Sequence, residues 1–372
     1  MSFLTYLRRD LEQIFFKERD PHAIPSMDGV FSPNDRLDRA TPIGDPLMGA
    51  DAVAEAPDGA ICVSAGNRIW RLSGHGYRDR AVLAELDSRV GALMFDREGH
   101  LFACTARGLA VLDDAGKTIK LVTQAEGEPL HCLTAIAAGP DGTIFISDGS
   151  TRHGVEDWRV DLMEGNRLGR VVVCGAALND TRVLLRGLNY PAGLAVADGH
   201  LWFTEGFAHQ LSRASITGQA TIAAPQAVIH NMPGYPSRLA RGREGNLWLS
   251  LLAARTHLVE FVLREDDFRL EMMRTIPQAY WIAPALSSGK DCLEPLQVGG
   301  LRALGIEKPW APPRSYGLVA QLDSDGEVIE TLHSRVGGRY HGITAVVETD
   351  QGVVIISKGS GCVLLHQAET PQ

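Results

Sequence analysis

The chain has 372 residues, of which 45% are hydrophobic and 22% are charged, and its formal net charge is −9. This composition is typical of globular proteins and excludes collagen, coiled coils and disordered chains. The acidic balance, without a long basic run, argues against a nucleic-acid groove, so we expect no nucleic-acid partner.

The first segment of the chain, residues 1–25, carries apolar side chains at helical spacing and predicts a short amphipathic helix. These side chains are Phe3, Leu4, Leu7, Leu11, Ile14 and Phe15. The helix could dock on a membrane surface or a partner, support self-association, or pack on its own domain. No stretch reaches the ~18 apolar residues of a transmembrane helix, so we expect no transmembrane segment.

One segment type recurs along the rest of the chain: an apolar run, a turn that ends in Gly, and a second apolar run. Asp-Gly and Glu-Gly favour tight turns with positive φ, so each copy predicts a β-hairpin. The turn glycines are 40, 43, 57, 46 and 107 residues apart, and three of these spacings match a propeller blade. The six copies are residues 53–64, 93–104, 136–147, 194–205, 239–250 and 346–357.

Further short β-prone runs follow each hairpin and bring most repeats to four strands. The last repeat lacks its fourth strand, and we expect residues 36–48 to supply it and close the ring. The predicted fold class is therefore all-β. Residues 26–372 form a single six-bladed β-propeller with four-stranded blades, preceded by the N-terminal helix. Rossmann, Walker A, nucleophile-elbow and zinc-protease motifs are absent from the sequence.

Two insertions interrupt the repeat, at residues 148–168 in blade three and 252–314 in blade five. In antiparallel four-stranded blades, the loops that enter strand one and those that join strands two and three lie at the same face. Both insertions therefore surround one mouth of the central channel. The second carries Tyr280, Trp281 and Trp310, and we expect it to form a lid over a small organic ligand. It is also a candidate for self-association.

The six cysteines are widely spaced and lack the C-x-x-C pattern, so zinc and iron–sulfur sites are not expected. Most of them lie in apolar runs and are interpreted as buried small hydrophobes. A reducing, cytoplasmic location fits this usage.

Several motifs then resemble the strictosidine synthase-like family, which is grouped with gluconolactonases and paraoxonases among six-bladed propellers. They occur in the family's order, and the likeness covers about residues 26–366. The motifs are SDGSTRHGVEDWRVDLMEGNRLGRV (147–171), GLNYPAGLAV (187–196), MPGYPSRLARGREGNLWLSLLAARTHL (232–258) and YGLVAQLDSDGEVIETL (316–332). The resemblance implies an enzyme of lactone or ester hydrolysis, or of amine–aldehyde condensation.

The resemblance also implies a calcium or similar ion at the channel axis in the hydrolytic relatives. The matching positions here are Asp51, Thr134, Ala192, Ser237 and Arg238. Only Asp51 is a strong ligand, whereas a hard divalent ion takes six to eight oxygens. We therefore predict no metal and no cofactor, with axial calcium as the alternative. The catalytic Glu of strictosidine synthase corresponds to Thr344, so that chemistry is not carried over.

The predicted catalytic residues are His341, Arg238 and Asp51. His341 could act as a general acid or base, or be hydrogen-bonded in a turn. Arg238 could anchor a carboxylate or stabilise an oxyanion, or form an ion pair with Asp51 that fills the metal position. Asp51 in turn could orient a histidine or neutralise Arg238.

Further side chains near the same mouth are predicted to bind substrate. For His153 and Trp158, the alternative is a helix start with an acidic first turn at Glu156 and Asp157. The predicted substrate-binding residues are His131, Thr134, Tyr190, Tyr235, Ser237, Thr344, His153, Trp158, His209 and Trp281.

The sequence thus favours a metal-independent enzyme that uses acid–base chemistry on a compact organic substrate at the channel mouth. The reaction would be lactone or ester hydrolysis, or a lyase or condensation reaction. The alternatives are a metal-dependent lactonase or arylesterase and a propeller that binds ligands or acts as a scaffold without catalysis.

Overall fold

The computed structural model of the chain describes residues 22–218, 221–287, 302–303, 306–307 and 315–367. The helix predicted over residues 1–25 lies outside this part, except for residues 22–25, which form turn and irregular structure. Most of residues 288–314 of the predicted lid also lie outside the described residues.

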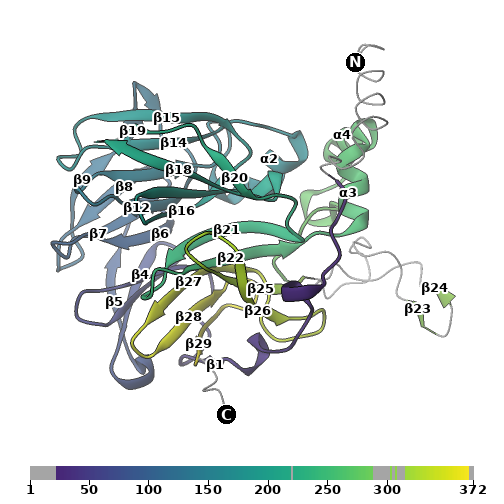
Figure 1. Cartoon of the computed structure of the whole chain (residues 1–372), viewed down its shortest axis with the longest axis horizontal. Coiled ribbons are helices and arrows are strands. Elements are labelled where there is room, and N and C mark those ends of the chain that lie inside the picture. The colour runs from purple at the N-terminus through teal and green to yellow at the C-terminus, as the bar shows by residue number, and fades with distance from the viewer. Residues whose placement is uncertain (1–21, 219–220, 288–301, 304–305, 308–314, 368–372) are drawn as a thin grey trace.

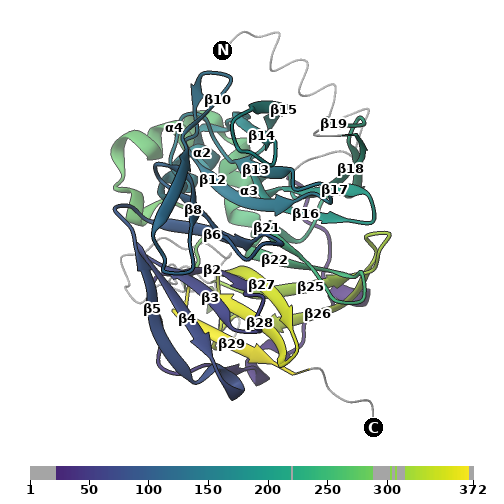
Figure 2. The ribbon, with the colours of Figure 1, turned by 90° about the vertical axis from the view of Figure 1, so that its left-hand side faces the viewer.

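Six antiparallel sheets succeed one another around a ring, as the predicted propeller requires (Figures 1 and 2). The first three are β2 (Ala50–Glu55), β3 (Ile61–Ala65), β4 (Arg68–Ser73) and β5 (Asp79–Glu85); β6 (Val90–Phe95), β7 (Leu101–Thr105), β8 (Gly108–Leu112) and β9 (Thr118–Val122); and β12 (Leu133–Ala138), β13 (Ile144–Asp148), β14 (Gly169–Cys174) and β15 (Thr181–Leu188). A short hairpin of β10 (Gln124–Ala125) and β11 (Glu128–Pro129) precedes the third sheet.

The other three sheets complete the ring. They are β16 (Pro191–Ala197), β17 (His200–Glu205), β18 (Gln210–Gly218) and β20 (Gln226–Ile229), with β19 (Thr221–Ile222) on the end of β18; β21 (Gly234–Arg241), β22 (Leu247–Ala254), β25 (Gly317–Leu322) and β26 (Val328–Ser334); and β27 (Ile343–Thr349), β28 (Gly352–Ser357), β29 (Cys362–His366) and β1 (Thr41–Pro42). A hairpin of β23 (Arg302–Ala303) and β24 (Ile306–Glu307) lies in the second insertion.

The ring closes as predicted, because a segment from the N-terminal side completes the last blade. In β1, Thr41 pairs with Leu365 and Pro42 with Leu364 of β29. The purple start of the described chain therefore lies beside the yellow end (Figure 2). This pairing ties the two ends of the propeller together and covers an edge that would otherwise be open.

The six predicted hairpin turns share one backbone feature, a glycine with positive φ. These residues are Gly59, Gly99, Gly142, Gly199, Gly245 and Gly352. Glycine adopts this region without the steric cost that a Cβ imposes. The glycine excess of the composition is thus partly explained by the blade turns.

The apolar core lies between neighbouring blades and leaves the axis to other side chains. One cluster, for example, joins Val63 of the first blade to Ile356 of the sixth, and another joins Phe145 of the third to Phe203 of the fourth. The second strands of the blades, such as β3 and β13, are buried on both faces. Their sequences are therefore apolar almost without interruption.

The described helices of both insertions lie at one face of the ring (Figure 1). The first insertion contains the 3₁₀ turn η5 (Val155–Asp157) and α2 (Trp158–Glu164), so the helix-start interpretation of this segment is confirmed. The second contains α3 (His257–Arg264), α4 (Asp266–Thr275) and η7 (Gln278–Tyr280). The other 3₁₀ turns are η2 (Gly29–Phe31), η3 (Leu37–Arg39), η4 (His75–Tyr77) and η6 (Gly206–Ala208). Among the described residues, no helix is long and apolar enough to cross a membrane.

Candidate active site at the channel mouth

A register shift occurs near the start of the innermost strand of every blade, where the strand reaches the axis. In β2 it falls between Ala50 and Ala52, in β12 between Leu133 and Ala135, and in β27 between Ile343 and Ala345. The innermost strands β6, β16 and β21 have the same irregularity. Such bulges re-aim side chains and are common next to functional sites.

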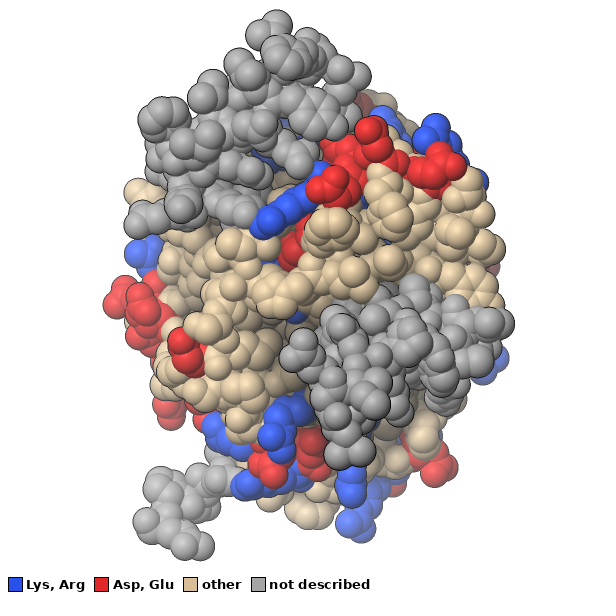
Figure 3. All heavy atoms as spheres, turned by 90° about the vertical axis from the view of Figure 1, so that its right-hand side faces the viewer, with Lys and Arg blue, Asp and Glu red and all other residues tan. Residues whose placement is uncertain are grey.

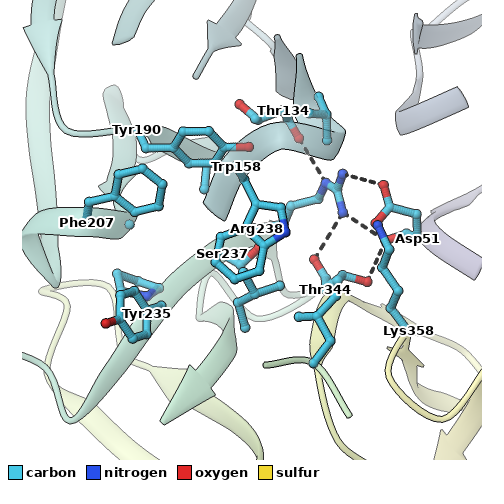
Figure 4. Close-up of a pocket in the computed structure, with 16 residues that line it drawn as sticks. Asp51, Thr134, Trp158, Tyr190, Phe207, Tyr235, Ser237, Arg238, Thr344 and Lys358 are labelled. Carbon is cyan, nitrogen blue, oxygen red and sulfur yellow. Dashed lines mark hydrogen bonds and ion pairs between the residues drawn. The ribbon is translucent and has the colours of Figure 1, made fainter. Parts of the chain in front are cut away.

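A pocket lies at this end of the axis, on the side that carries the insertions. Charged and hydroxyl side chains form one end of it, and aromatic and aliphatic side chains form the rest (Figure 4). Its lining residues are Asp51, Thr134, Val155, Trp158, Tyr190, Ala192, Gly206, Phe207, Tyr235, Pro236, Ser237, Arg238, Leu252, Leu286, Thr344 and Lys358. Seen from this side, most of the described surface across the middle of the face is uncharged (Figure 3).

The guanidinium of Arg238 spans the axis and joins four of the six blades. Its Nε donates to the main-chain oxygen of Thr134 (2.9 Å), and Nη1 donates to those of Asp51 (2.8 Å) and Thr344 (3.2 Å). Its Nη2 lies 3.1 Å from Oδ2 of Asp51. The planar fork of Arg suits this arrangement, because its donors point in several fixed directions at once.

Asp51 is the carboxylate of the axis, and three cations contact it. Besides Arg238, Nζ of Lys358 lies 3.0 Å from Oδ1, and Nη2 of Arg89 lies 3.4 Å from Oδ2. Arg89 also pairs with Glu156 of η5, on the first insertion. Thr344 donates its hydroxyl to the main-chain oxygen of Asp51 (2.7 Å). Asp51 therefore neutralises cations and does not orient a histidine.

The protonation of this cluster follows from its burial and its charges. Burial alone would raise the pKa of Asp51, but Arg238, Lys358 and Arg89 together hold it well below its usual range. Burial lowers the pKa of Lys358, and Arg89 and Arg238 act in the same direction, against the ion pair with Asp51. Asp51 is thus firmly ionised, whereas Lys358 loses its proton more readily than a surface lysine.

Aromatic rings form the wall opposite the charges. Tyr190 and Phe207 are stacked, with ring centroids 4.5 Å apart, and Trp158 of α2 and Tyr235 of β21 complete the wall. Leu286 of the second insertion also reaches the pocket. The cavity measures about 60 Å³. The arrangement suits a compact molecule with an apolar body and a polar group directed at the axis.

The axial residues do not fit a calcium ion. The carboxylate of Asp51 and three main-chain carbonyls surround the guanidinium of Arg238, and each of them already accepts one of its N–H groups. Ala192 supplies no side-chain ligand atom, and a guanidinium stands among the oxygens where a cation would be held. A hard divalent ion requires several anionic oxygens, and Asp51 is the single carboxylate among the described residues that line the pocket.

The structure brings eight of the thirteen predicted site residues together at the pocket. Arg238 forms the ion pair with Asp51, which was one of the two roles expected for it from the sequence. Trp158 contributes to the pocket as the first residue of helix α2, so both interpretations of its segment apply. The eight are Asp51, Arg238, Thr134, Tyr190, Tyr235, Ser237, Thr344 and Trp158.

His341 does not line the pocket. Its Nδ1 lies 2.6 Å from the hydroxyl of Ser315, and its Nε2 lies 3.0 Å from the main-chain oxygen of Arg335. Burial lowers the pKa of this histidine. Both ring nitrogens are therefore engaged with other groups, which corresponds to the turn interpretation, and the catalytic role of His341 stays a prediction.

Four predicted substrate-binding residues also lie away from the pocket lining. His131 is exposed before β12, and His153 contacts Glu164 within the first insertion (2.8 Å). His209 is buried, and its Nδ1 lies 3.0 Å from the main-chain oxygen of Gly234. The fourth, the buried Trp281, donates its Nε1–H to the main-chain oxygen of Ile276 (2.8 Å).

Lys358 is the principal site residue that the sequence reasoning missed. It follows β28, in the turn that leads to β29, and therefore lies at the mouth face like other loops between strands two and three. No motif surrounds it. Its place in the repeat was the signal that could have identified it. The rule that loops between strands two and three lie at the mouth face placed both insertions correctly and applies to Lys358 as well.

Comparisons with known proteins agree with this architecture. The sequence model of the strictosidine synthase family matches residues 135–219. Two Arabidopsis thaliana relatives are strictosidine synthase-like protein 4 (24% identical, covering 50% of this chain and 51% of the relative) and protein 13 (25% identical, covering 68% and 57%). The chain thus spans about half the length of these curated relatives. The family resemblance predicted from the sequence is confirmed.

Two solved structures share the fold at low sequence identity. A gluconolactonase from Xanthomonas campestris has a TM-score of 0.57 at 15% identity, covering 88% of this chain and 90% of that one. A regucalcin from Agrobacterium tumefaciens, described as a calcium-binding protein, has a TM-score of 0.54 at 11% identity, covering 91% and 96%. At such identities the likeness concerns the fold alone.

Proposed function

We propose, from its likeness to the strictosidine synthase family, that this six-bladed propeller is a small-molecule enzyme that works without a metal ion. The reaction takes place in the axial pocket and is hydrolysis of a lactone or ester, or a lyase or condensation reaction. The observation that carries the proposal is the position of Arg238, whose guanidinium occupies the axis and uses the oxygens that a metal would need.

The chemistry common to these reactions is the development of negative charge on an oxygen atom. Fixed positive charge in a partly enclosed, apolar site stabilises such an oxygen more than water does. Lys358 and Arg238 supply this charge, and Lys358, whose pKa is lowered by burial, also exchanges a proton near the reacting group. Asp51 holds both cations in place and stays ionised throughout.

The likeness to a gluconolactonase and a regucalcin favours a second candidate, a metal-dependent lactonase. The donor set at the axis speaks against this candidate, since the pocket offers one carboxylate and a competing guanidinium. The catalytic role of His341, a cytoplasmic location and self-association stay predictions.

The test is turnover of a panel of lactones, esters and amine–aldehyde pairs in the presence of a chelator. Wild-type protein, Lys358→Met and the matched control Lys117→Met, an exposed lysine in the turn between β8 and β9, are compared. We expect turnover that survives chelation, is lost in Lys358→Met and is retained in the control. Turnover that needs added calcium would replace this proposal by the lactonase. Binding without turnover would make the chain a ligand-binding propeller.

A further inference from the structure

The charges that face the pocket are not balanced. Arg238, Lys358 and Arg89 all contact the carboxylate of Asp51, at 3.1, 3.0 and 3.4 Å. Glu156 adds a second carboxylate, but it pairs with Arg89 and does not line the pocket. Arg89 does not line the pocket either. Among the described lining residues, the two cations Arg238 and Lys358 therefore share the one carboxylate of Asp51, and one positive charge is left over at the polar end of the cavity.

Lys358 is the cation with donors to spare. An ammonium group has three N–H donors, and Asp51 takes one of those of Lys358. The described residues place no other hydrogen-bond acceptor on it. Its side chain is 22% exposed and lines the pocket, so the remaining donors are available to a ligand. Arg238, by contrast, commits four N–H groups to protein oxygens.

We propose that the substrates of this pocket are organic monoanions, in which a carboxylate is attached to a compact apolar body. This inference rests on the proposed function and narrows its substrate class. The carboxylate accepts one hydrogen bond from Lys358, beside the positive charge of Arg238, and compensates the surplus cation. The third N–H donor of Lys358 is left for the reacting oxygen. The apolar body lies against Tyr190, Phe207 and Tyr235, which Figure 4 shows on the side away from Asp51 and Lys358.

The same charges exclude other ligand classes. An amine would place a fourth cation beside Arg238, Lys358 and Arg89, a like-charge contact that selects against it. A neutral molecule would leave the donors of Lys358 without a strong acceptor in a partly desolvated site. A carboxylate is therefore expected to bind about 10- to 100-fold more tightly than its neutral isostere.

The test uses three probes of similar size that suit a cavity of about 60 Å³: propionate, propionamide and propylamine. Their affinities are measured by isothermal titration calorimetry at pH 7 and low salt. Wild-type protein is compared with Lys358→Met, Lys358→Arg and the control Lys117→Met. We expect propionate to bind most tightly. The preference should disappear in Lys358→Met, persist in part in Lys358→Arg, and be unchanged in the control. Thermal unfolding of each variant verifies that it is folded.

Several results would overturn the inference. They are propionamide or propylamine binding as tightly as propionate, no measurable binding of propionate, or an undiminished preference in folded Lys358→Met. Each of them leaves the enzyme proposal to its own turnover test. Conversely, a preference for propionate in a protein that turns over no substrate would remove the enzyme proposal and keep the anion site.

Discussion

Two buried Arg–carboxylate pairs differ in how their surroundings complete them. In the second insertion (252–314), here called the lid, Nε of Arg255 lies 2.8 Å from Oε1 of Glu260, a residue of helix α3. The other carboxylate oxygen of Glu260 lies 2.9 Å from Nδ1 of His22. His209 approaches the same carboxylate, and Arg255 also contacts Asn231. At the axis, Arg238 and Asp51 form a pair of the same kind, but Lys358 and Arg89 join it.

The difference between the two pairs is the balance of charge and the access to a cavity. Burial would raise the pKa of Glu260, but His22, Arg255 and His209 lower it to about 2. The lid pair is thus one carboxylate contacted by one permanent cation and two histidines. The axial pair has a surplus of positive charge, carried by arginine and lysine side chains, and it borders the pocket. Burial of an ion pair is therefore common to both, and the unbalanced charge distinguishes the pair at which we propose that a ligand binds.

The largest expected effect comes from removing each carboxylate. Asp51→Asn leaves three cations without their shared carboxylate, and Glu260→Gln removes the carboxylate that contacts Nε of Arg255. Loss of one partner of a buried pair costs about 3–5 kcal/mol. We expect both variants to be destabilised in urea denaturation, Asp51→Asn the more strongly. Equal stability of Asp51→Asn and wild type would contradict the axial half of the comparison.

A second effect concerns turnover and separates function from stability. Lys358→Met removes the surplus cation but leaves Asp51 paired with Arg238 and Arg89. Turnover should fall about a hundredfold, the usual cost of losing one group that stabilises a developing oxyanion. The urea midpoint should change little. A large loss of stability with normal turnover in the remaining folded protein would place Lys358 among the structural residues instead.

Of the two clusters, the one around Arg255 and Glu260 contains histidines and the axial one does not. This difference predicts that the stability of the chain depends on pH. Burial lowers the pKa of His209 to about 3, from an ordinary value of 6.5. Between these values the unfolded chain binds a proton that the folded chain does not, so the free energy of unfolding falls as the pH drops. At pH 5, His209 accounts for roughly 2 kcal/mol of this loss.

His209→Gln should therefore flatten the dependence of stability on pH between 6.5 and 4, as measured by urea denaturation at several pH values. Part of the slope will remain, because burial also lowers the pKa of His333 to about 4. An unchanged slope in His209→Gln would show that His209 is protonated in the folded chain.

The smallest effect is expected where the lid meets the pocket. A Cβ on Gly359 would lie 1.8 Å from the main-chain oxygen of Leu286, so the lid segment must move in Gly359→Ala. Overpacking of this kind costs about 1 kcal/mol or somewhat more. Since Leu286 lines the pocket, the KM should change as well. The control is Gly175→Ala, whose Cβ would meet no atom within 4 Å, and equal KM values in the two variants would contradict a role for Leu286.

The blades could be predicted because their determinants are local. Gly99 and Gly245 mark turns with positive φ, and the spacing of such turns gives the number of blades. The closure by Thr41 and Pro42 followed from counting strands. These features depend on the periodicity and on turn chemistry, both of which can be read along the chain.

The site could be predicted only in part, because it depends on where side chains point. Asp51, Ser237 and Arg238 were found from their positions at the starts of innermost strands. His341 comes from an equivalent segment, yet it lies two residues before β27 and its ring contacts Ser315 instead. Lys358 lies in a turn of ordinary sequence, and its contact with Asp51 spans 307 residues. Sequence periodicity does not report a contact of that range.

The central claim is that the guanidinium of Arg238 takes the place of a divalent cation at the axis. The most direct measurement is a calcium titration of the purified, chelator-treated protein by isothermal titration calorimetry, with Asp51→Asn as the control. We predict no binding heat from an axial site in either protein and no change in melting temperature on adding calcium. One calcium ion bound per chain, lost in Asp51→Asn, would contradict the claim.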